Sequence, residues 1–476
     1  MGVIKLNNWS LSLIKEIIDI KQINNVDEDI VFDYLKIVDL NKVLYENNAK
    51  NVLYFFTYSE EKDLTDEFII DAFDLRKNAN SVISKHPEYV YVLDKQTYDN
   101  LEKENKNAKL IIVDNILKAI DQLYNYVIER KRAKVIAVTG SVGKTTAVGL
   151  IETVLKKEFN IWRIYSKRIT PIILKANVIN FITPDVDYIV LEMSIYHHDH
   201  VEILSDLLKP NIAALIGVDS SHLEFFNSID DICKYKAAIF RSCEVGFYNN
   251  LDNRVNLLSV KEENLLFDDE KIYKTQMSNF IPIADSYQIK DNKLIVDKEE
   301  MALFFNSELS VIQTLLAYKI GILVGMNKKH IVQAINSYVP VENRIGQKII
   351  FGKNVIFDGD ITTHERIKQL ANHQYPESYL IIRKFGSAEN NKRFENVLNS
   401  LNRFTKVFVF NDIEYLEMLK SHKKVQVVDN HDFMKELNGQ IIYHYSGYYR
   451  SFEKFNEDNL IVLENERYKV LKPEDE

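Results

Sequence analysis

The sequence has little cysteine, no excess of positive charge and no long apolar run. Its two cysteines, Cys233 and Cys243, are too few for a disulfide framework or a cysteine-based zinc site, and they fit a reducing compartment. Acidic residues outnumber basic ones by 69 to 60, so no net basic field exists to hold a nucleic-acid backbone. No stretch approaches the roughly 18 apolar residues of a membrane helix, and the N-terminus lacks a signal-peptide pattern. We therefore expect a cytoplasmic protein with no nucleic-acid partner and no membrane span.

Glycine and proline are scarce as well, with 14 and 8 copies in 476 residues, which we attribute to the composition of the source genome. The chain is too long for one hydrophobic core, and at roughly 150 residues per domain its length predicts about three domains. Short apolar runs alternate with helical spacings, which indicates an α/β fold. We place the domains at residues 1–132, 133–340 and 341–476.

The pattern of apolar residues in the first region, 1–132, predicts a small α/β domain. Strands are expected at 52–57, 90–93 and 110–113, and helices at 66–73 and 116–128. The charged run at 129–134, ERKRAK, resembles a basic ligand patch, but a solvated helix end and linker is the better interpretation.

The second region shows repeated strand–helix alternation, which indicates a parallel sheet with ligands at the carboxyl ends of its strands. Its expected strands are 135–138, 188–192 and 212–218, and helices at 310–324 and 328–337 complete it before Pro340. The third region repeats the alternation, with strands expected at 355–358, 379–382, 406–410 and 440–444. We expect it to be a Rossmann-like domain.

The stretch at 135–146, VIAVTGSVGKTT, predicts a buried strand, a glycine-containing loop and the first turn of a helix. Gly140 and Gly143 allow successive backbone N–H groups to converge on a phosphate at the helix N-terminus. Lys144 can then reach the outer phosphates, and the Thr145 hydroxyl can ligate Mg²⁺. The usual phosphate-loop spacing would require glycine two residues before Gly140, so the match is to a variant. A turn that only joins strand to helix is the competing interpretation.

We expect the whole loop to contact a nucleotide through Thr139, Gly140, Ser141, Val142, Gly143, Lys144, Thr145 and Thr146.

Three side chains downstream have competing functional and structural interpretations. Glu192 ends the apolar strand YIVLE, where a carboxylate is costly unless it faces a cation or a donor; an exposed strand-end glutamate is the alternative. His222, in GVDSSHLEFF, follows another strand and could complete a metal shell, although a lone histidine is more often structural. Lys236 lies near the apolar face of ICKYKAAIF. It is either a group with a perturbed pKa or a stem whose amine reaches water, and spacing alone favours the stem.

The run HHDH suggests a metal site because His197 and His200 lie three residues apart. No carboxylate or cysteine set with convincing ligand spacing accompanies it. We therefore expect an exposed polar loop or helix start, and we assign no metal to this run.

Several of these stretches resemble those of one family, the Mur ligases, which are ATP-dependent amide-bond ligases of cell-wall synthesis, and their folylpolyglutamate synthetase relatives. TGSVGKTT resembles the nucleotide loop of the family, and DYIVLEMS resembles its strand ending in a Mg²⁺-binding glutamate. The stretch at 210–240 resembles the signature that carries a metal-binding histidine and a carbamylated lysine. ENRIG and VIFDGD resemble the arginine and aspartate motifs of the third domain. The similarity spans nearly the whole chain, is strong from 135 to 240 and is weak after about 365.

The resemblance implies an ATP-dependent, ADP-forming carboxylate–amine ligase of peptidoglycan precursor synthesis that works through an acyl phosphate. It implies one Mg²⁺ on Thr145 and Glu192, and a second held through His222 and a carbamylated Lys236. The implied partners are ATP, a carboxylate-bearing acceptor that is UDP-linked in the family, and an amino acid or dipeptide. In order, the domains would bind the acyl substrate, bind ATP and complete the ligase.

Outside the loop, the residues that the resemblance assigns to the nucleotide are Gln313, Arg344 and Asp358. Those that it makes catalytic are Lys144, Lys236, His222 and Arg344.

The chain also departs from the family pattern. RITPIILKANVI replaces an asparagine-rich loop, SELSVIQTLLAY replaces an asparagine-rich helix near the adenine, and DGDITTHER lacks the Asn-Pro after the aspartate. Gln313 would therefore have to stand in for an asparagine, and the amino-acid specificity of the family is not transferable. Three alternatives remain open, namely a ligase with an acceptor outside peptidoglycan, a nucleotide-binding scaffold without ligase activity, and a phosphotransferase such as a kinase.

Overall fold

The structure is a computed structural model, and its chain divides into two compact units, which we describe separately. Unit 1 comprises residues 1–136 and 159–211, and unit 2 comprises residues 137–158 and 212–476. The residues that the structure describes are 7, 9–38, 49–58, 74–164, 169–195, 197–219, 226–260, 265–266, 272–273, 279–290, 293–303, 307–339, 346–350, 353–358, 378–382, 398–411, 416–430, 432–437, 442–446 and 462–464.

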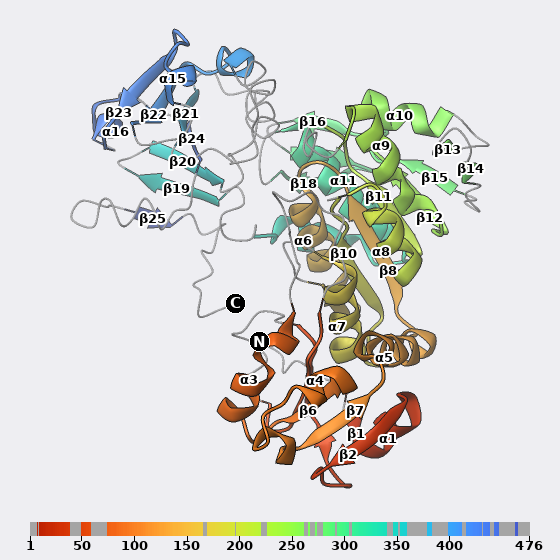
Figure 1. Cartoon of the computed structure of the whole chain (residues 1–476). Coiled ribbons are helices and arrows are strands. Elements are labelled where there is room, and N and C mark those ends of the chain that lie inside the picture. The colour runs from red at the N-terminus through yellow and green to blue at the C-terminus, as the bar shows by residue number, and fades with distance from the viewer. Residues whose placement is uncertain are drawn as a thin grey trace. The chain divides into compact units, whose positions relative to one another are not determined.

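Unit 1 begins with a five-stranded sheet of order β2-β7-β6-β5-β4 (Figure 1). The neighbours from β4 to β7 are parallel, and β2 pairs antiparallel with β7. Its strands are β2 (Ile20–Asn24), β4 (Tyr34–Lys36), β5 (Val52–Phe55), β6 (Val90–Asp94) and β7 (Leu110–Val113). The smaller elements are β1 (Trp9–Ser10), α1 (Leu11–Ile17), β3 (Val31–Phe32), η2 (Leu75–Asn78), α3 (Ala79–Lys85), α4 (Lys95–Asp99) and η3 (Asn105–Asn107). Every residue of β5, β6 and β7 is buried, as expected for parallel strands covered on both faces.

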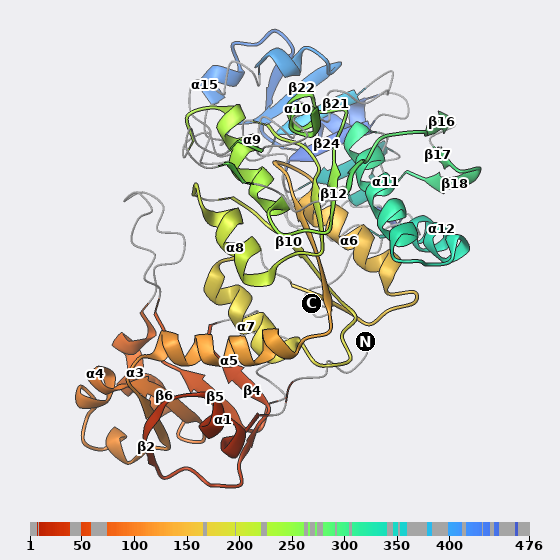
Figure 2. The same ribbon diagram turned by 90° about the vertical axis from the view of Figure 1, so that its right-hand side faces the viewer.

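Two helices of unit 1 lie side by side, α5 (Ile116–Arg130) and α7 (Pro171–Phe181) (Figure 2). The Asn115 side chain caps α5 by accepting a hydrogen bond from the Lys118 backbone N at 2.9 Å. In α7, the buried Asn180 side chain donates to the Leu35 carbonyl and accepts from the Leu35 N, both at 2.9 Å. These two bonds attach α7 to β4. The unit also contains the parallel pair β9 (Ile161–Arg163) and β10 (Tyr188–Glu192), and α8 (His200–Leu208).

Unit 2 contains a helical layer of α6 (Lys144–Leu155), α11 (Glu308–Leu323) and α12 (Lys328–Asn336), which pack on one another (Figure 2). The approach is close at Gly321 of α11, where a Cβ would lie 2.8 Å from Ile331 Cδ1 and 3.1 Å from Val154 Cγ1. A larger residue at 321 would therefore separate α11 from both neighbours.

Three strands of unit 2 pair in parallel in the sequence order of the chain, namely β11 (Ile212–Leu215), β12 (Val245–Tyr248) and β15 (Asn279–Pro282). They belong to a six-stranded sheet of order β15-β12-β11-β8-β10-β9, and the division between the units falls within β8 (Lys134–Thr139). The associated helices are α9 (Ile229–Ala237), η4 (Ala238–Phe240) and α10 (Asn253–Val260). Short antiparallel strands follow in two sheets, β13 (Leu265–Leu266) with β14 (Ile272–Tyr273), and β16 (Gln288–Lys290), β17 (Lys293–Val296) and β18 (Glu299–Ala302).

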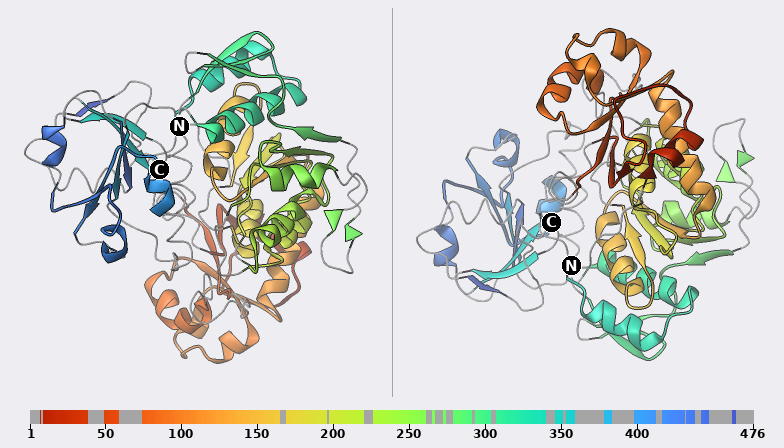
Figure 3. Two further views of the ribbon diagram at one scale, coloured as in Figure 1. Left: turned by 90° about the horizontal axis from the view of Figure 1, so that it is seen from above. Right: turned by 90° about the horizontal axis from the view of Figure 1, so that it is seen from below.

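The last region carries a seven-stranded sheet of order β23-β22-β21-β24-β20-β19-β25, drawn in cyan and blue in Figure 3. The strands from β23 to β20 are parallel, whereas β19 pairs antiparallel with β20 and β25. Its elements are β19 (Gly346–Ile350), β20 (Lys353–Asp358), β21 (Ser378–Ile382), β22 (Lys406–Phe410), α15 (Leu416–Leu419), β23 (Val425–Val428), α16 (Phe433–Glu436), β24 (Ile442–Ser446) and β25 (Val462–Glu464).

The predicted α/β fold class is confirmed, since three largely parallel sheets with helices follow one another along the chain. The predicted strands occur close to their expected positions. The largest difference is β11, which was expected at 212–218 and ends at Leu215. The first two residues of the strand expected at 440–444 lie outside the described residues. The predicted helix at 66–73 lies outside the described residues. The domain limits at 132/133 and 340/341 stay a prediction. Within the part of the chain that the structure describes, no helix is long and apolar enough to cross a membrane.

Candidate nucleotide-binding site

The loop after β8 has the backbone geometry that the sequence predicts for a phosphate-binding loop. Five of the six residues of β8 are buried, and Gly143, the residue before α6, has φ +84° in the left-handed region. A Cβ at Gly143 would be strained and would lie 2.5 Å from Gln313 Nε2. At Gly140 a Cβ would lie 2.7 Å from Ile216 Cγ1 and 3.2 Å from the Gly217 carbonyl oxygen. Only glycine fits either position, and α6 has no side-chain cap at its N-terminus.

Lys144, the first residue of α6, reaches back over this loop. Its Nζ donates to the carbonyl oxygens of Gly140 at 2.9 Å and Ser141 at 3.3 Å. The amine therefore lies over the loop at the positive end of a helix dipole, where anions are stabilised. Thr145 and Thr146 follow in the first turn of α6, and Thr146 is buried.

Lys236 on α9 is fully buried and approaches the same loop. Its Nζ donates to the Gly140 carbonyl oxygen at 3.1 Å. Burial, and after it the positive charge of Lys144, hold the pKa of Lys236 well below the ordinary lysine value. The interpretation of Lys236 as a stem whose amine reaches water is therefore wrong, because no part of the side chain is exposed.

Ser141 ties the phosphate loop to the segment that follows β11. Its N donates to the Gly217 carbonyl at 2.9 Å, its hydroxyl donates to the Asp219 carbonyl at 3.1 Å, and the Asp219 N donates to that hydroxyl at 2.7 Å. Ser141 was predicted only as a nucleotide contact. The structure shows that its hydroxyl also joins two loops at the carboxyl ends of β8 and β11.

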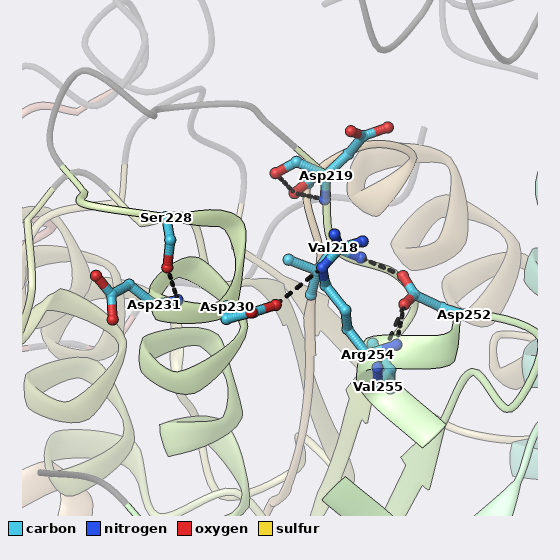
Figure 4. A network of polar contacts seen from close by, with 9 residues as sticks. Val218, Asp219, Ser228, Asp230, Asp231, Asp252, Arg254 and Val255 are labelled. Atoms are coloured by element: carbon cyan, nitrogen blue, oxygen red, sulfur yellow. Dashed lines mark hydrogen bonds and ion pairs between the residues drawn. The ribbon is translucent and has the colours of Figure 1, made fainter. Parts of the chain in front are cut away.

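Asp252 also holds the segment that follows β11 (Figure 4). One carboxylate oxygen accepts from the Val218 N at 2.7 Å, and the other accepts from the Arg254 N at 3.0 Å and the Val255 N at 3.3 Å, at the start of α10. Arg254 in turn donates through Nε to Asp230 on α9 at 2.9 Å. Sequence reasoning missed Asp252, although an aspartate directly before a helical stretch is a recognisable capping signal.

Gln313 on α11 is almost completely buried and contacts the loop directly. Its Nε2 donates to the Gly143 carbonyl oxygen at 2.8 Å, whereas its buried Oε1 has no hydrogen-bond partner in the part of the chain that the structure describes. The Tyr338 hydroxyl also donates to α6, to the Thr146 carbonyl oxygen at 3.4 Å. The structure thus brings together the loop, Lys144, Lys236 and Gln313, all within unit 2.

The remaining predicted site residues are not part of that cluster as described. Glu192 is half-buried at the end of β10 in unit 1, so its distance from the loop stays a prediction. His222 and Arg344 lie outside the described residues, and Asp358 is the last residue of β20. Among the described residues, no group of three or more His, Cys, Asp or Glu side chains is placed to hold a metal ion.

The HHDH run is a helix start, as predicted, but it is not uniformly exposed. His200 begins α8, is buried and contacts the Ile169 carbonyl oxygen through Nε2 at 3.0 Å. His197 stacks on His200 with ring centroids 4.9 Å apart, and only His198 and Asp199 are exposed. The expectation of an exposed polar loop is therefore wrong for His200, because its ring packs into the core of unit 1.

The glycine loop lies at a helix N-terminus and is contacted by Lys144 and Lys236. These features define the middle of the chain as a P-loop α/β domain. The predicted resemblance to the Mur ligase family is confirmed, because residues 138–289 match the Mur ligase middle domain.

One curated relative, the UDP-N-acetylmuramoyl-tripeptide–D-alanyl-D-alanine ligase of Rickettsia prowazekii, is 32% identical over 138 residues, which are 29% of this chain and 30% of that protein. The matched stretches cover between 30% and 50% of the first four such relatives.

Solved structures extend the likeness in fold over most of the chain. MurF from Acinetobacter baumannii has a TM-score of 0.69 at 13% identity, covering 94% of this chain and 98% of that one. MurF ligase from Thermotoga maritima, in complex with ADP, has a TM-score of 0.64 at 15% identity, covering 86% and 94%. At these identities the likeness shows the three-domain α/β fold and no more.

Proposed function

We propose that this protein is an ATP-dependent, ADP-forming carboxylate–amine ligase of the Mur type. The observation that carries the proposal is the pair of lysine amines on one phosphate-loop carbonyl, since Lys144 and Lys236 both donate to Gly140 O, at 2.9 and 3.1 Å. An ordinary phosphate loop needs only one of these lysines. The second, fully buried, lies where the family resemblance expects a modified lysine, in a chain that carries the Mur ligase middle domain.

In the proposed reaction, a substrate carboxylate attacks the γ-phosphate of ATP, and an amine then displaces phosphate from the acyl phosphate to form an amide. The first step requires negative charge to be stabilised on the transferring phosphoryl group. The uncapped N-terminus of α6 offers backbone N–H groups and a positive dipole end for that charge. On binding ATP, the Lys144 amine would exchange its bonds to the Gly140 and Ser141 carbonyls for bonds to phosphate oxygens.

We propose that Lys236 reacts with CO₂ to form a carbamate. A neutral amine is the nucleophile in this addition, a new N–C bond forms, and one proton is released. The lowered pKa of Lys236, caused by its burial and by Lys144, favours that neutral amine. Once formed, the carbamate anion would be stabilised by the positive charge of the neighbouring Lys144.

The residues present fit magnesium in part, since the Thr145 hydroxyl belongs to the first turn of α6, next to Lys144. The proposed ligands are Thr145, Glu192, His222 and carbamylated Lys236. Magnesium, when bound, would neutralise charge on the phosphates. We propose that Arg344 and Asp358 reach the nucleotide from residues 341–476, and that domain closure keeps water from the acyl phosphate.

The acceptor and the amine are proposed from the names of the relatives. A relative that joins UDP-N-acetylmuramoyl-tripeptide to D-alanyl-D-alanine suggests a UDP-linked acceptor and a dipeptide, and hence a place in peptidoglycan precursor synthesis in the cytoplasm. We assign the acyl substrate to residues 1–132, ATP to 133–340 and completion of the ligase to 341–476.

The test is phosphate release from ATP across a panel of acyl acceptors and amines that includes UDP-muramoyl-tripeptide with D-Ala-D-Ala. ADP, free phosphate and a new amide, formed only when acceptor and amine are both present, are expected. If the same products form only with a different acceptor, the protein is still a ligase, but its place in peptidoglycan precursor synthesis is wrong. Nucleotide binding without turnover on any pair would instead indicate a scaffold, and a phosphorylated stable product would indicate a phosphotransferase.

A further inference from the structure

Gln313 is the one amide side chain that reaches the phosphate loop within the described residues of α11. It is 1% exposed, and its Nε2 lies 2.8 Å from the Gly143 carbonyl oxygen. This contact fixes the orientation of the amide, because the flipped amide would place Oε1, an acceptor, against the Gly143 carbonyl oxygen, which is also an acceptor. The fit also depends on glycine at 143, where a Cβ would lie 2.5 Å from Nε2.

The carbonyl that Gln313 contacts is the one that starts α6. The Gly143 oxygen also accepts the first backbone bond of the helix, from the Ala147 N at 3.0 Å. In a trans peptide the C=O and the following N–H point in opposite directions. Two donors that hold the Gly143 oxygen toward the helix therefore turn the Lys144 N–H outward, in the direction from which a helix N-terminus binds phosphate.

Two further polar side chains of α11, Ser310 and Thr314, are buried close to Gln313 in the sequence. Thr314 is 0% exposed and Ser310 is 1% exposed, and among the described residues neither hydroxyl has a hydrogen-bond partner. The same is true of Gln313 Oε1. A buried amide that leaves one end unsatisfied is destabilising by itself, so the bond from its other end to Gly143 is the contact that accounts for a glutamine here.

We propose that Gln313 is a positioning residue of the phosphate loop, which acts through the Gly143 carbonyl and not by contact with the base. The family resemblance instead places this residue beside the adenine. The inference rests on the proposed binding of ATP at the loop, and the two interpretations differ in what they predict for ligands without a base.

The experiment measures binding of ATP, GTP and inorganic tripolyphosphate, each with Mg²⁺, to the full chain by calorimetry. Gln313→Met keeps the length of the side chain and removes the donor, and Gln313→Glu keeps its shape and replaces the donor with an acceptor. Thr314→Val is the matched control, since it removes an unpartnered hydroxyl from the next residue of the same helix. The folded fraction of each variant is taken from the calorimetric binding stoichiometry and from its thermal transition.

Because Gln313→Met removes one neutral hydrogen bond, we expect it to lower the affinities for ATP and for tripolyphosphate by the same factor, roughly five- to tenfold. The ratio of ATP to GTP affinity stays unchanged, Gln313→Glu loses at least as much, and Thr314→Val binds as the wild type does. A loss for ATP alone, with tripolyphosphate unaffected, would assign Gln313 to the base and overturn the inference. Unchanged affinities in both Gln313 variants would overturn it too. A wild-type protein that binds none of the three ligands would refute the proposed function itself.

Discussion

Two stretches of this chain place possible ligand side chains within a few residues of the end of a buried strand, and they differ in what those side chains face. The loop after β8 brings two lysine amines to the Gly140 carbonyl, at 2.9 and 3.1 Å, beside a helix N-terminus. The HHDH run after β10 turns His200 inward, onto the Ile169 carbonyl, and leaves His198 exposed. Residue type alone suggested a metal site at the HHDH run. The contacts of these side chains instead indicate an anion site at the loop after β8 and a core contact at His200.

The largest expected effect is that of Lys144→Ala. This change removes the cation that would follow charge onto the γ-phosphate, and it should lower ATP turnover on the order of 10²-fold or more. Phosphate release measures the effect. Lys156→Ala is the control, because Lys156 follows the end of the same helix, half-exposed and paired with Glu152. Wild-type turnover in a folded Lys144→Ala protein would remove the premise that this loop binds nucleotide.

Lys236→Ala should come next, with a loss of about 10- to 100-fold in acyl-phosphate formation and little change in ATP affinity. If a carbamate normally occupies this place, short carboxylic acids such as acetate should enter the vacated space and restore part of the turnover. Lys234→Ala is the matched control, two residues away on α9 and only half-buried. Full activity of the alanine variant without added acid would eliminate the carbamate.

These two predictions depend on features that the sequence revealed to different degrees. The loop was predictable because glycine spacing, an apolar strand and a helical pattern coincide within a dozen residues, so local rules sufficed. The burial of Lys236 could not be predicted, because the spacing of residues on α9 does not show that its amine contacts the Gly140 carbonyl, 96 residues away. Asp252 and Gln313 have the same property. Their partners, Val218 and Gly143, are 34 and 170 residues distant and are fixed only by the tertiary fold.

The pH dependence of the free energy of unfolding tests whether Lys236 is a buried, neutral amine. Because burial lowers the pKa of Lys236 in the folded state, the unfolded chain binds a proton there that the folded chain does not. The free energy of unfolding should therefore rise with pH, by at most about 1.4 kcal/mol per pH unit, from the lowered pKa up to the ordinary lysine value of 10.5. Lys236→Met should lack this slope in CO₂-free buffer. Parallel pH profiles of the two proteins would show that the amine stays charged in the fold.

The smallest expected effects concern the histidine run, where the two members should behave differently. His200→Ala removes a buried ring and its bond to the Ile169 carbonyl, so it should lower the free energy of unfolding by roughly 1–3 kcal/mol while ATP affinity per folded molecule is kept. His198→Ala changes an exposed side chain and should stay within about 0.5 kcal/mol of the wild type. Denaturant titration gives both values, and metal analysis of the purified proteins is the accompanying control. A transition metal that is bound by the wild type and lost in either variant would show that this run is a ligand site after all, and the distinction between the two stretches would then fail.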